Sequence, residues 1–236
     1  MKILINRPIF DSINLKKILE KKGYEVIVLP IIKIIPIKFD IKKFSNISIY
    51  IFTSRNAIRS IDDTIFNKDL PVYVVGEGTA EEAKLKNFKK IIIGKGDVFS
   101  LCKQICNDLN PKLENILYLS GKKISFDLLN FLEKYDYNIR RQICYETREL
   151  GVFSEKTKNI FIDKEIDAIA FYSKNTAKIF NKLIINSQIS DKLYDVKAFC
   201  LSKDIASELN HFNRLKIYVS ENPNQKSFIS LLDKYK

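Results

Sequence analysis

The chain has 236 residues, of which 46% are hydrophobic and 29% are charged, and its formal net charge at pH 7 is +12. A chain of this size can bury about 70% of its unfolded surface, so it needs neither disulfides nor a structural metal to fold. No run approaches the ~18 consecutive apolar residues of a membrane-spanning helix. A single histidine, His211, argues against a structural zinc site and against a histidine-dependent catalytic triad.

Short apolar strands alternate with amphipathic helical stretches along the whole chain. The first strand, Lys2–Asn6, runs into Arg7-Pro8, unlike the apolar segment and small-residue cleavage site of a secretion signal. Helical patterns such as Asn14–Lys22 and Asp127–Tyr135 separate most strands. The other expected strands are Glu25–Pro30, Ile47–Thr53, Val72–Val75, Lys90–Ile93, Ile116–Leu119, Asn138–Tyr145, Ala168–Tyr172, Val196–Leu201 and Leu215–Val219. This alternation predicts parallel sheets that helices cover on both faces.

Three segments of the first half recur in the same order in the second half. The segments that begin at Ile3, Ile51 and Val74 match those that begin at Ile116, Ala170 and Cys200. The chain therefore resembles a duplicated βα unit, with one copy that ends near Asn110 and another that runs to Lys236.

Polar motifs stand where expected strands end and helices begin. The first is Thr53-Ser54-Arg55-Asn56, and Tyr172-Ser173-Lys174-Asn175 repeats it in the second copy. A serine at such a point is first of all a helix N-cap. A helix N-terminus also presents N–H groups that suit a carboxylate or phosphate. Because the motif is doubled, and Gly76-Glu77-Gly78-Thr79 accompanies the first copy, we expect two similar lobes to hold an anionic ligand.

Several other patterns point to weaker alternatives. Gly76-x-Gly78 after a strand begins like a dinucleotide fingerprint, but Glu81 replaces the third glycine. The positive charge would suit a polyanion, yet the lysines are spread along every helix, which argues against nucleic acid. The four cysteines, Cys102, Cys106, Cys144 and Cys200, are scattered, as is typical of a reducing compartment.

Tyr145 lies at the end of a strand, near a candidate domain junction. Gly151 breaks the pattern there, and the apolar stretch around Pro36 is the other candidate crossing point. The default interpretation of Tyr145 is a core tyrosine. The alternative is a hydroxyl that donates a proton to a substrate.

In order and spacing, these motifs resemble the uroporphyrinogen-III synthase family. The motifs that carry the resemblance are Arg7-Pro8, IFTSRNA, VYVVGEGTAEEA, ILYLSGKK, Tyr145-Glu146-Thr147, AFYSKNTA and FCLSKDIASEL, and together they cover essentially the whole chain. The resemblance implies an α/β fold of two flavodoxin-like domains with parallel sheets, joined by a two-stranded β linker. Domain 1 would comprise residues 1–36 plus 149–236, and domain 2 residues 39–146. The linkers would lie at about 33–40 and 144–150.

The resemblance also implies a cofactor-free cyclising hydro-lyase of tetrapyrrole (heme) biosynthesis. It would close hydroxymethylbilane to uroporphyrinogen III with inversion of ring D and loss of water. Tyr145 falls on the family's proposed acid, and the residues implied for substrate binding are Ser54, Gly76, Gly78, Thr79, Ser173, Ser202 and Lys203. Ser202 and Ile205 depart from the usual Gly and Thr of the second-lobe motif. Ile205 cannot supply a hydroxyl, so three alternatives remain: this lobe binds the substrate differently, Lys203 compensates, or the enzyme is slow.

The implied partners are the linear tetrapyrrole substrate and, transiently, the deaminase that makes it. We expect a cytoplasmic monomer that binds neither nucleic acid nor membrane and holds no metal. The alternative is a non-catalytic two-lobed module that binds a small polycarboxylate or a nucleotide-like anion.

Overall fold

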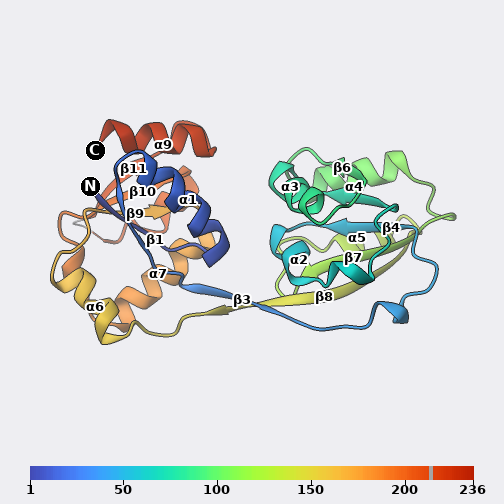
Figure 1. Cartoon of the computed structure of the whole chain (residues 1–236), viewed down its shortest axis with the longest axis horizontal. Helices are drawn as coiled ribbons and strands as arrows, with labels where there is room; N and C mark the ends of the chain where they lie inside the picture. The colour runs from blue at the N-terminus through green and yellow to red at the C-terminus, as the bar shows by residue number, and fades with distance from the viewer. Residues whose placement is uncertain (213–214) are drawn as a thin grey trace. The chain divides into compact units, whose positions relative to one another are not determined.

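Both ends of the chain contribute strands to one sheet, and the middle of the chain builds a second. The computed structural model describes residues 1–212 and 215–236. Unit 1 comprises Met1–Lys33 with Arg148–Lys236, and unit 2 comprises Ile34–Thr147. The chain crosses from one unit to the other in β3 (Ile32–Pro36) and in β8 (Asn138–Glu149), which run side by side in Figure 1.

Unit 1 contains a five-stranded parallel sheet in the order β11-β10-β9-β1-β2. Its strands are β1 (Lys2–Ile5), β2 (Glu25–Val28), β9 (Ala168–Phe171), β10 (Lys197–Cys200) and β11 (Lys216–Val219). Its helices are α1 (Ile9–Lys21), α6 (Glu155–Ile162), α7 (Lys174–Asn186), α8 (Lys203–Ser207) and α9 (Gln225–Lys234), with a 3-10 turn at Ser190–Leu193. Numbered along the chain, the strands stand in the 2-1-3-4-5 order of a flavodoxin-like sheet.

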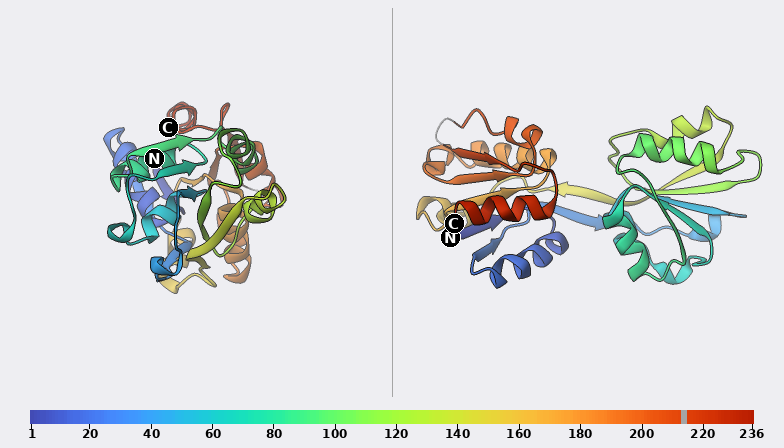
Figure 2. Two further views of the ribbon diagram at one scale, coloured as in Figure 1. Left: turned by 90° about the vertical axis from the view of Figure 1, so that its right-hand side faces the viewer. Right: turned by 90° about the horizontal axis from the view of Figure 1, so that it is seen from above.

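Helices cover both faces of the unit 1 sheet. Leu19 of α1 and Phe228 of α9 are fully buried against one face, and both chain ends lie at this unit in the right-hand view of Figure 2. On the other face, Phe161 of α6 and Phe180 of α7 pack their rings together, 6.2 Å between centroids. Phe180 also packs edge-on against Phe171 of β9, at 5.2 Å.

Helix α1 begins at Ile9, five residues before the start expected from its apolar period. Pro8 stands just before it with φ −50°, which suits the entry into a helix. The first turn leaves Phe10 62% exposed, so the buried face begins only with Ser12 and Leu15. Apolar periodicity therefore reports where this helix packs and misses its exposed first turn.

Unit 2 contains a six-stranded sheet in the order β3-β8-β7-β4-β5-β6. Its remaining strands are β4 (Ile49–Phe52), β5 (Pro71–Val74), β6 (Lys90–Ile93) and β7 (Asn115–Gly121). Its helices are α2 (Arg55–Ser60), α3 (Glu77–Leu85), α4 (Val98–Asp108) and α5 (Leu128–Glu133), with 3-10 turns at Ile41–Lys43 and Asp63–Ile65. The backbone N–H of Ile37 donates to Cys144 O and that of Leu150 to Ile31 O, both at 2.9 Å, which makes β3 and β8 an antiparallel pair.

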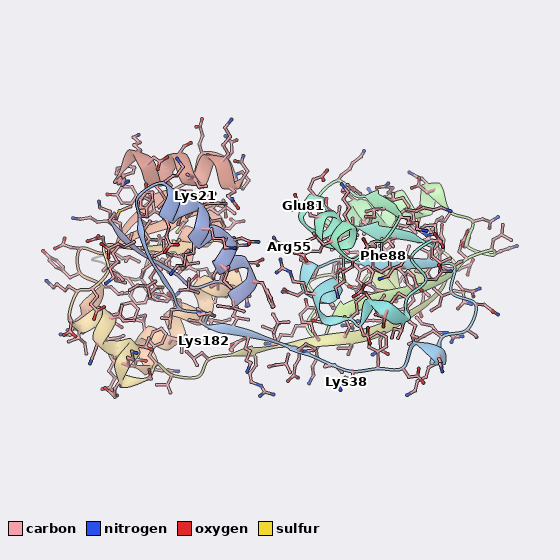
Figure 3. All side chains as sticks on the ribbon, viewed as in Figure 1. Lys21, Lys38, Arg55, Glu81, Phe88 and Lys182 are labelled. Carbon is pink, nitrogen blue, oxygen red and sulfur yellow. The ribbon has the colours of Figure 1, made fainter. Side chains whose placement is uncertain are left out.

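Side chains of the unit 2 strands alternate between two helix-covered faces. Phe52 and Leu119 pack with Ala57 of α2 and Ala83 of α3. Their neighbours along the strands pack instead with Leu101 of α4 and Leu132 of α5; they include Ile51 and Tyr118. Figure 3 labels Phe88, which lies inside the first of these two clusters.

The two sheets have one arrangement but different chain connectivity. The spatial order β2-β1-β9-β10-β11 of unit 1 matches β8-β7-β4-β5-β6 of unit 2. The repeated segments occupy matching strands, because β1 corresponds to β7, β9 to β4 and β10 to β5. Each sequence copy thus gives its first βαβ segment to one sheet and its remainder to the other. Asn110, where the repeat divides, lies inside unit 2.

Among residues 1–212 and 215–236, no helix combines the length and the apolar character needed to cross a membrane.

Candidate functional site

In each unit, one pair of neighbouring strands is followed by helices that cover opposite faces of the sheet. The pair is β1 and β9 in unit 1, and β7 and β4 in unit 2. In doubly wound folds, ligands bind outside the carboxyl ends of the strands at this switch point. The residues that follow or end these strands are Asn6, Arg7, Tyr172 and Ser173 in unit 1 and Ser120, Gly121, Thr53 and Ser54 in unit 2.

In unit 2, four hydroxyl groups form two hydrogen-bonded pairs at the switch point. Tyr145 Oη donates to Ser54 Oγ at 3.3 Å, and Thr53 Oγ1 shares a 3.1 Å hydrogen bond with Tyr118 Oη. Ser54 is also the N-cap of α2, since its Oγ accepts from the backbone N–H of Asn56 at 3.2 Å. The same serine therefore starts the helix and holds the Tyr145 hydroxyl.

Burial controls the protonation state of Tyr145, which is only 8% exposed. Loss of hydration raises the pKa of Tyr145 above its usual value of 10, because a buried phenolate is poorly solvated. The hydrogen bond with Ser54 acts in the opposite direction. At neutral pH the phenol is protonated, as a proton donor must be.

The Gly76–Thr79 segment starts α3 beside the start of α2. Gly76 is the N-cap and supplies no side chain to cap the first turn. A Cβ atom on Gly78 would lie 3.3 Å from Arg55 Cδ, so Arg55 covers the start of α3; Figure 3 labels Arg55. Thr79 is buried, and its N–H donates to Gly76 O at 3.0 Å. The structure thus brings Ser54, Gly76, Gly78 and Thr79 together in unit 2, with the Thr79 N–H engaged inside the turn.

In unit 1, Ser173 is the N-cap of α7, as Ser54 is the N-cap of α2 in unit 2. Its Oγ accepts from the backbone N–H of Thr176 at 3.1 Å and shares a 2.6 Å hydrogen bond with the Thr176 hydroxyl. On the neighbouring strand end, the guanidinium of Arg7 lies 4.4 Å from the centre of the Tyr172 ring. A cation therefore stands over an aromatic ring at this switch point.

Two side chains at the same edge have buried polar atoms without hydrogen-bond partners in the described part of the chain. They are both amide atoms of Asn6, a residue with 0% exposure, and the hydroxyl of Tyr172. An unsatisfied buried polar group costs about 1–3 kcal/mol. Sequence reasoning missed Asn6; its only signal is an amide that ends the apolar run KILI.

The FCLSKDIASEL motif of unit 1 differs from the matching VYVVGEGTAEEA motif of unit 2 in its side chains at the start of the helix. Ser202 precedes α8 and makes no side-chain cap hydrogen bond, and Lys203 is exposed in the first turn. Ile205 is buried where the matching residue of unit 2 is Thr79. A buried threonine of one unit is thus replaced by a buried isoleucine in the other.

The cysteines pack in the cores as free thiols. Burial raises the pKa of Cys102, Cys144 and Cys200 to about 12, so these thiols stay protonated at neutral pH. Within the described residues, no group of three or more His, Cys, Asp or Glu side chains is arranged to hold a metal ion.

Comparisons with known proteins identify similar sequences and structures. Residues 14–230 match the family model HEM4, described as uroporphyrinogen-III synthase HemD. No individual curated protein sequence matches the chain. A uroporphyrinogen-III synthetase structure from Helicobacter pylori is 19% identical with a TM-score of 0.67, over 100% of this chain and 99% of that one. A mutant uroporphyrinogen III synthase from Thermus thermophilus is 14% identical with a TM-score of 0.59, over 100% and 97%. At these identities the structural likeness concerns the fold.

Proposed function

The chain belongs to the uroporphyrinogen-III synthase family, and we propose that Tyr145 is the acid of its reaction. Members of this family are cyclising lyases of tetrapyrrole biosynthesis. The reaction closes hydroxymethylbilane to uroporphyrinogen III, with inversion of ring D and loss of water. The comparisons favour this enzyme over a non-catalytic anion-binding module.

The first step removes the terminal hydroxyl of the bilane. Tyr145 gives its proton to that hydroxyl, which leaves as water while the adjacent pyrrole nitrogen, which keeps its own proton, supplies electrons to form an electrophilic protonated azafulvene. The substituted carbon of ring D attacks the azafulvene and forms a spiro intermediate. This intermediate fragments and recloses with ring D inverted, and the proton released at the final closure restores the phenol.

The observation that carries the role of Tyr145 is its buried hydroxyl, held by Ser54 at 3.3 Å at the unit 2 switch point. A phenol is already protonated at neutral pH, burial raises its pKa further, and Ser54 fixes its direction. When the proton leaves, the Ser54 hydroxyl can turn and donate to the phenolate oxygen, which lowers the cost of the charged state.

Substrate binding falls to helix starts and hydroxyls. We assign it to Ser54, Gly76, Gly78 and Thr79 of unit 2, and to Ser173, Ser202 and Lys203 of unit 1. Helix N-termini attract carboxylates, and the first turn of α3 begins without a side-chain cap. The net charge of +12 attracts a polycarboxylate over longer distances. Free bilane closes spontaneously without inversion, so the residues around the substrate must favour the geometry of spiro closure.

A coupled assay tests both the reaction and the acid. Porphobilinogen and its deaminase supply fresh bilane, the protein is added, and oxidised products are separated into isomers I and III. Wild-type protein should give mainly isomer III. Tyr145→Phe should lower kcat about 100-fold, the lower end of the range for a general acid, and shift products towards isomer I. Only isomer I from folded wild-type protein would refute the activity, and near-wild-type turnover by Tyr145→Phe would refute its role as the acid.

We further propose that the family's two domains are units 1 and 2, and that the protein acts as a cytoplasmic monomer. The four free thiols fit a reducing compartment. Transient hand-over from the deaminase would shorten the time in which bilane closes by itself. Light scattering tests the monomer, and a dilution series of the two enzymes tests hand-over, because transfer through bulk solution would raise the isomer I fraction on dilution.

A further inference from the structure

The register between β7 and β8 breaks immediately before Tyr145. Ser120 pairs with Ile143, but Gly121 pairs with Tyr145, so Cys144 is an extra residue in β8. A β-bulge of this kind changes the face to which the following side chain points, and bulges are frequent beside active sites.

The bulge decides which face of the sheet carries the phenol. Ile139, an even number of residues before Tyr145, packs in the cluster with α4 and α5. Strict alternation would place Tyr145 on that same face. Instead Cys144 and Tyr145, although adjacent, both pack in the cluster with α2 and α3. Only this face carries Ser54, the partner of the hydroxyl.

Gly121 provides the space that the phenol occupies. A Cβ atom at position 121 would lie 2.5 Å from Cζ, 2.8 Å from Oη and 2.9 Å from Cε2 of Tyr145. All three are atoms at the hydroxyl end of the ring. A single methyl group at this position would therefore displace the hydroxyl itself.

Arg141 lies on β8, the strand that carries Tyr145, and hydrogen-bonds to the end of β7. Its Nε donates to Ser120 Oγ at 2.7 Å, and one terminal nitrogen donates to Gly121 O at 2.8 Å and to Lys122 O at 3.2 Å. These bonds join both sides of the register break. A planar guanidinium can hold several acceptors in a fixed arrangement, which a single ammonium cannot do.

We propose that Gly121 and Arg141 are positioning residues that aim the Tyr145 hydroxyl at the reacting end of the substrate. Gly121 leaves room for the ring, and Arg141 holds the register break that turns the ring towards α2. The inference rests on the proposed role of Tyr145 and adds two residues that act only through it.

A double-mutant cycle tests Gly121. In the wild-type background, Gly121→Ala should lower kcat about 10- to 100-fold. A displacement of a reacting group by about 1 Å causes a loss of rate of this order in other active sites. In the Tyr145→Phe background the same change should alter kcat less than about 2-fold, because no hydroxyl remains to be displaced. Equal losses in the two backgrounds would overturn the inference.

Arg141→Gln provides a second test that does not depend on the folding of Gly121→Ala. It removes the guanidinium donors, and Arg140→Gln is the matched control, since Arg140 is an exposed neighbour on the same strand. We expect kcat to fall about tenfold with little change in KM for Arg141→Gln, and no change for the control. Arg141→Lys should restore only part of the rate. Equal effects of Arg141→Gln and Arg140→Gln would overturn the inference.

A spectroscopic measurement separates this inference from the proposed activity. The titration of Tyr145 is isolated as the tyrosinate absorbance difference between each protein and its Tyr145→Phe counterpart. A loosened ring gains solvent, so its pKa should fall towards 10 in Arg141→Gln and stay unchanged in Arg140→Gln. If wild-type protein yields only isomer I, the activity fails while this titration still reports the positioning. An unchanged Tyr145 titration in Arg141→Gln would overturn the inference even if wild-type protein makes isomer III.

Discussion

The switch points of the two units share a backbone arrangement and differ in how their polar groups are satisfied. Thr53 and Tyr172 hold matching places after β4 and β9. Tyr118 on the adjacent strand gives Thr53 a partner at 3.1 Å. Ile5 holds the corresponding place in unit 1, and the Tyr172 hydroxyl has no partner in the described residues. Unit 2 thus has a hydrogen-bonded pair of hydroxyls where unit 1 has a phenol without a partner in the described residues.

This difference indicates how a duplicated sheet can divide its roles. In unit 2 the hydrogen bonds of Ser54, Ser120 and Arg141 fix groups around one buried phenol. In unit 1 the Asn6 amide and the Tyr172 hydroxyl have no partners among the described residues, although Arg7 lies over the Tyr172 ring and pairs with Asp11 at 3.4 Å. One copy of the architecture thus fixes its polar groups by internal hydrogen bonds, and the other keeps polar atoms without partners in the described residues.

Removal of each phenol hydroxyl gives the largest expected contrast. Tyr145→Phe should lower kcat about 100-fold. Tyr172→Phe should leave kcat unchanged, raise KM about tenfold, and stabilise the fold by about 1 kcal/mol, because an unsatisfied group is removed. Steady-state kinetics and urea unfolding of the two variants measure the contrast. Equal losses of kcat would show that the units do not divide their roles in this way.

Substitution of a polar side chain at the switch point should have opposite effects on stability in the two units. Asn6→Leu replaces two unpartnered amide atoms by a side chain of similar shape and should stabilise the protein by about 2 kcal/mol. The control Thr53→Val breaks the hydrogen bond between Thr53 and Tyr118, so it should destabilise by about 1 kcal/mol. Hydrogen exchange of peptides from each unit measures the change in stability that each substitution causes. Destabilisation by Asn6→Leu would mean that the amide has a partner, such as an ordered water.

Alkaline pH should weaken unit 2 more steeply than unit 1. Burial raises the pKa of Cys102 and Cys144 in unit 2, and of Cys200 in unit 1, from 9.0 to about 12. The folded state holds these protons more tightly than the unfolded chain. Their contribution is therefore complete below pH 9 and is lost as pH rises towards 12, by about 1.4 kcal/mol per thiol for each pH unit.

Hydrogen exchange of unit-specific peptides between pH 8 and 11, corrected for intrinsic rates, measures this loss. Cys200→Ala should reduce the dependence for unit 1, where the raised pKa values of Tyr24 and Tyr172 still contribute above about pH 10, and leave that of unit 2 unchanged. An equal loss of stability per pH unit in the two units would contradict the prediction.

The smallest contrast concerns two serines of unit 1 that precede helices. Ser173→Ala removes a cap hydrogen bond and should cost about 1 kcal/mol of unfolding free energy. Ser202→Ala should cost less than about 0.5 kcal/mol, because Ser202 makes no cap bond. Thermal unfolding compares the two, and equal shifts in Tm would show that Ser202 has a stabilising contact of its own.

Local signals in the sequence predicted much of the fold. The expected strands overlap observed ones because each is a short, strongly apolar run between polar segments. The caps at Ser54 and Ser173 follow from serines placed directly after a strand. By contrast, β8 continues to Glu149 beyond its expected end at Tyr145, because β3 pairs with its far half. No local pattern reports a partner strand that lies about 100 residues away.

By itself, the sequence determined the alternating strands and helices, the duplication and the hydroxyls at helix starts, because each of these depends on neighbouring residues. Only the tertiary structure decided which copy's strands pair in each sheet, which face carries Tyr145, and that the Asn6 amide and the Tyr172 hydroxyl have no partners among the described residues. These features depend on strand register. The side chains of a strand alternate between faces, so one extra residue, Cys144, moves the phenol to the other side of the sheet.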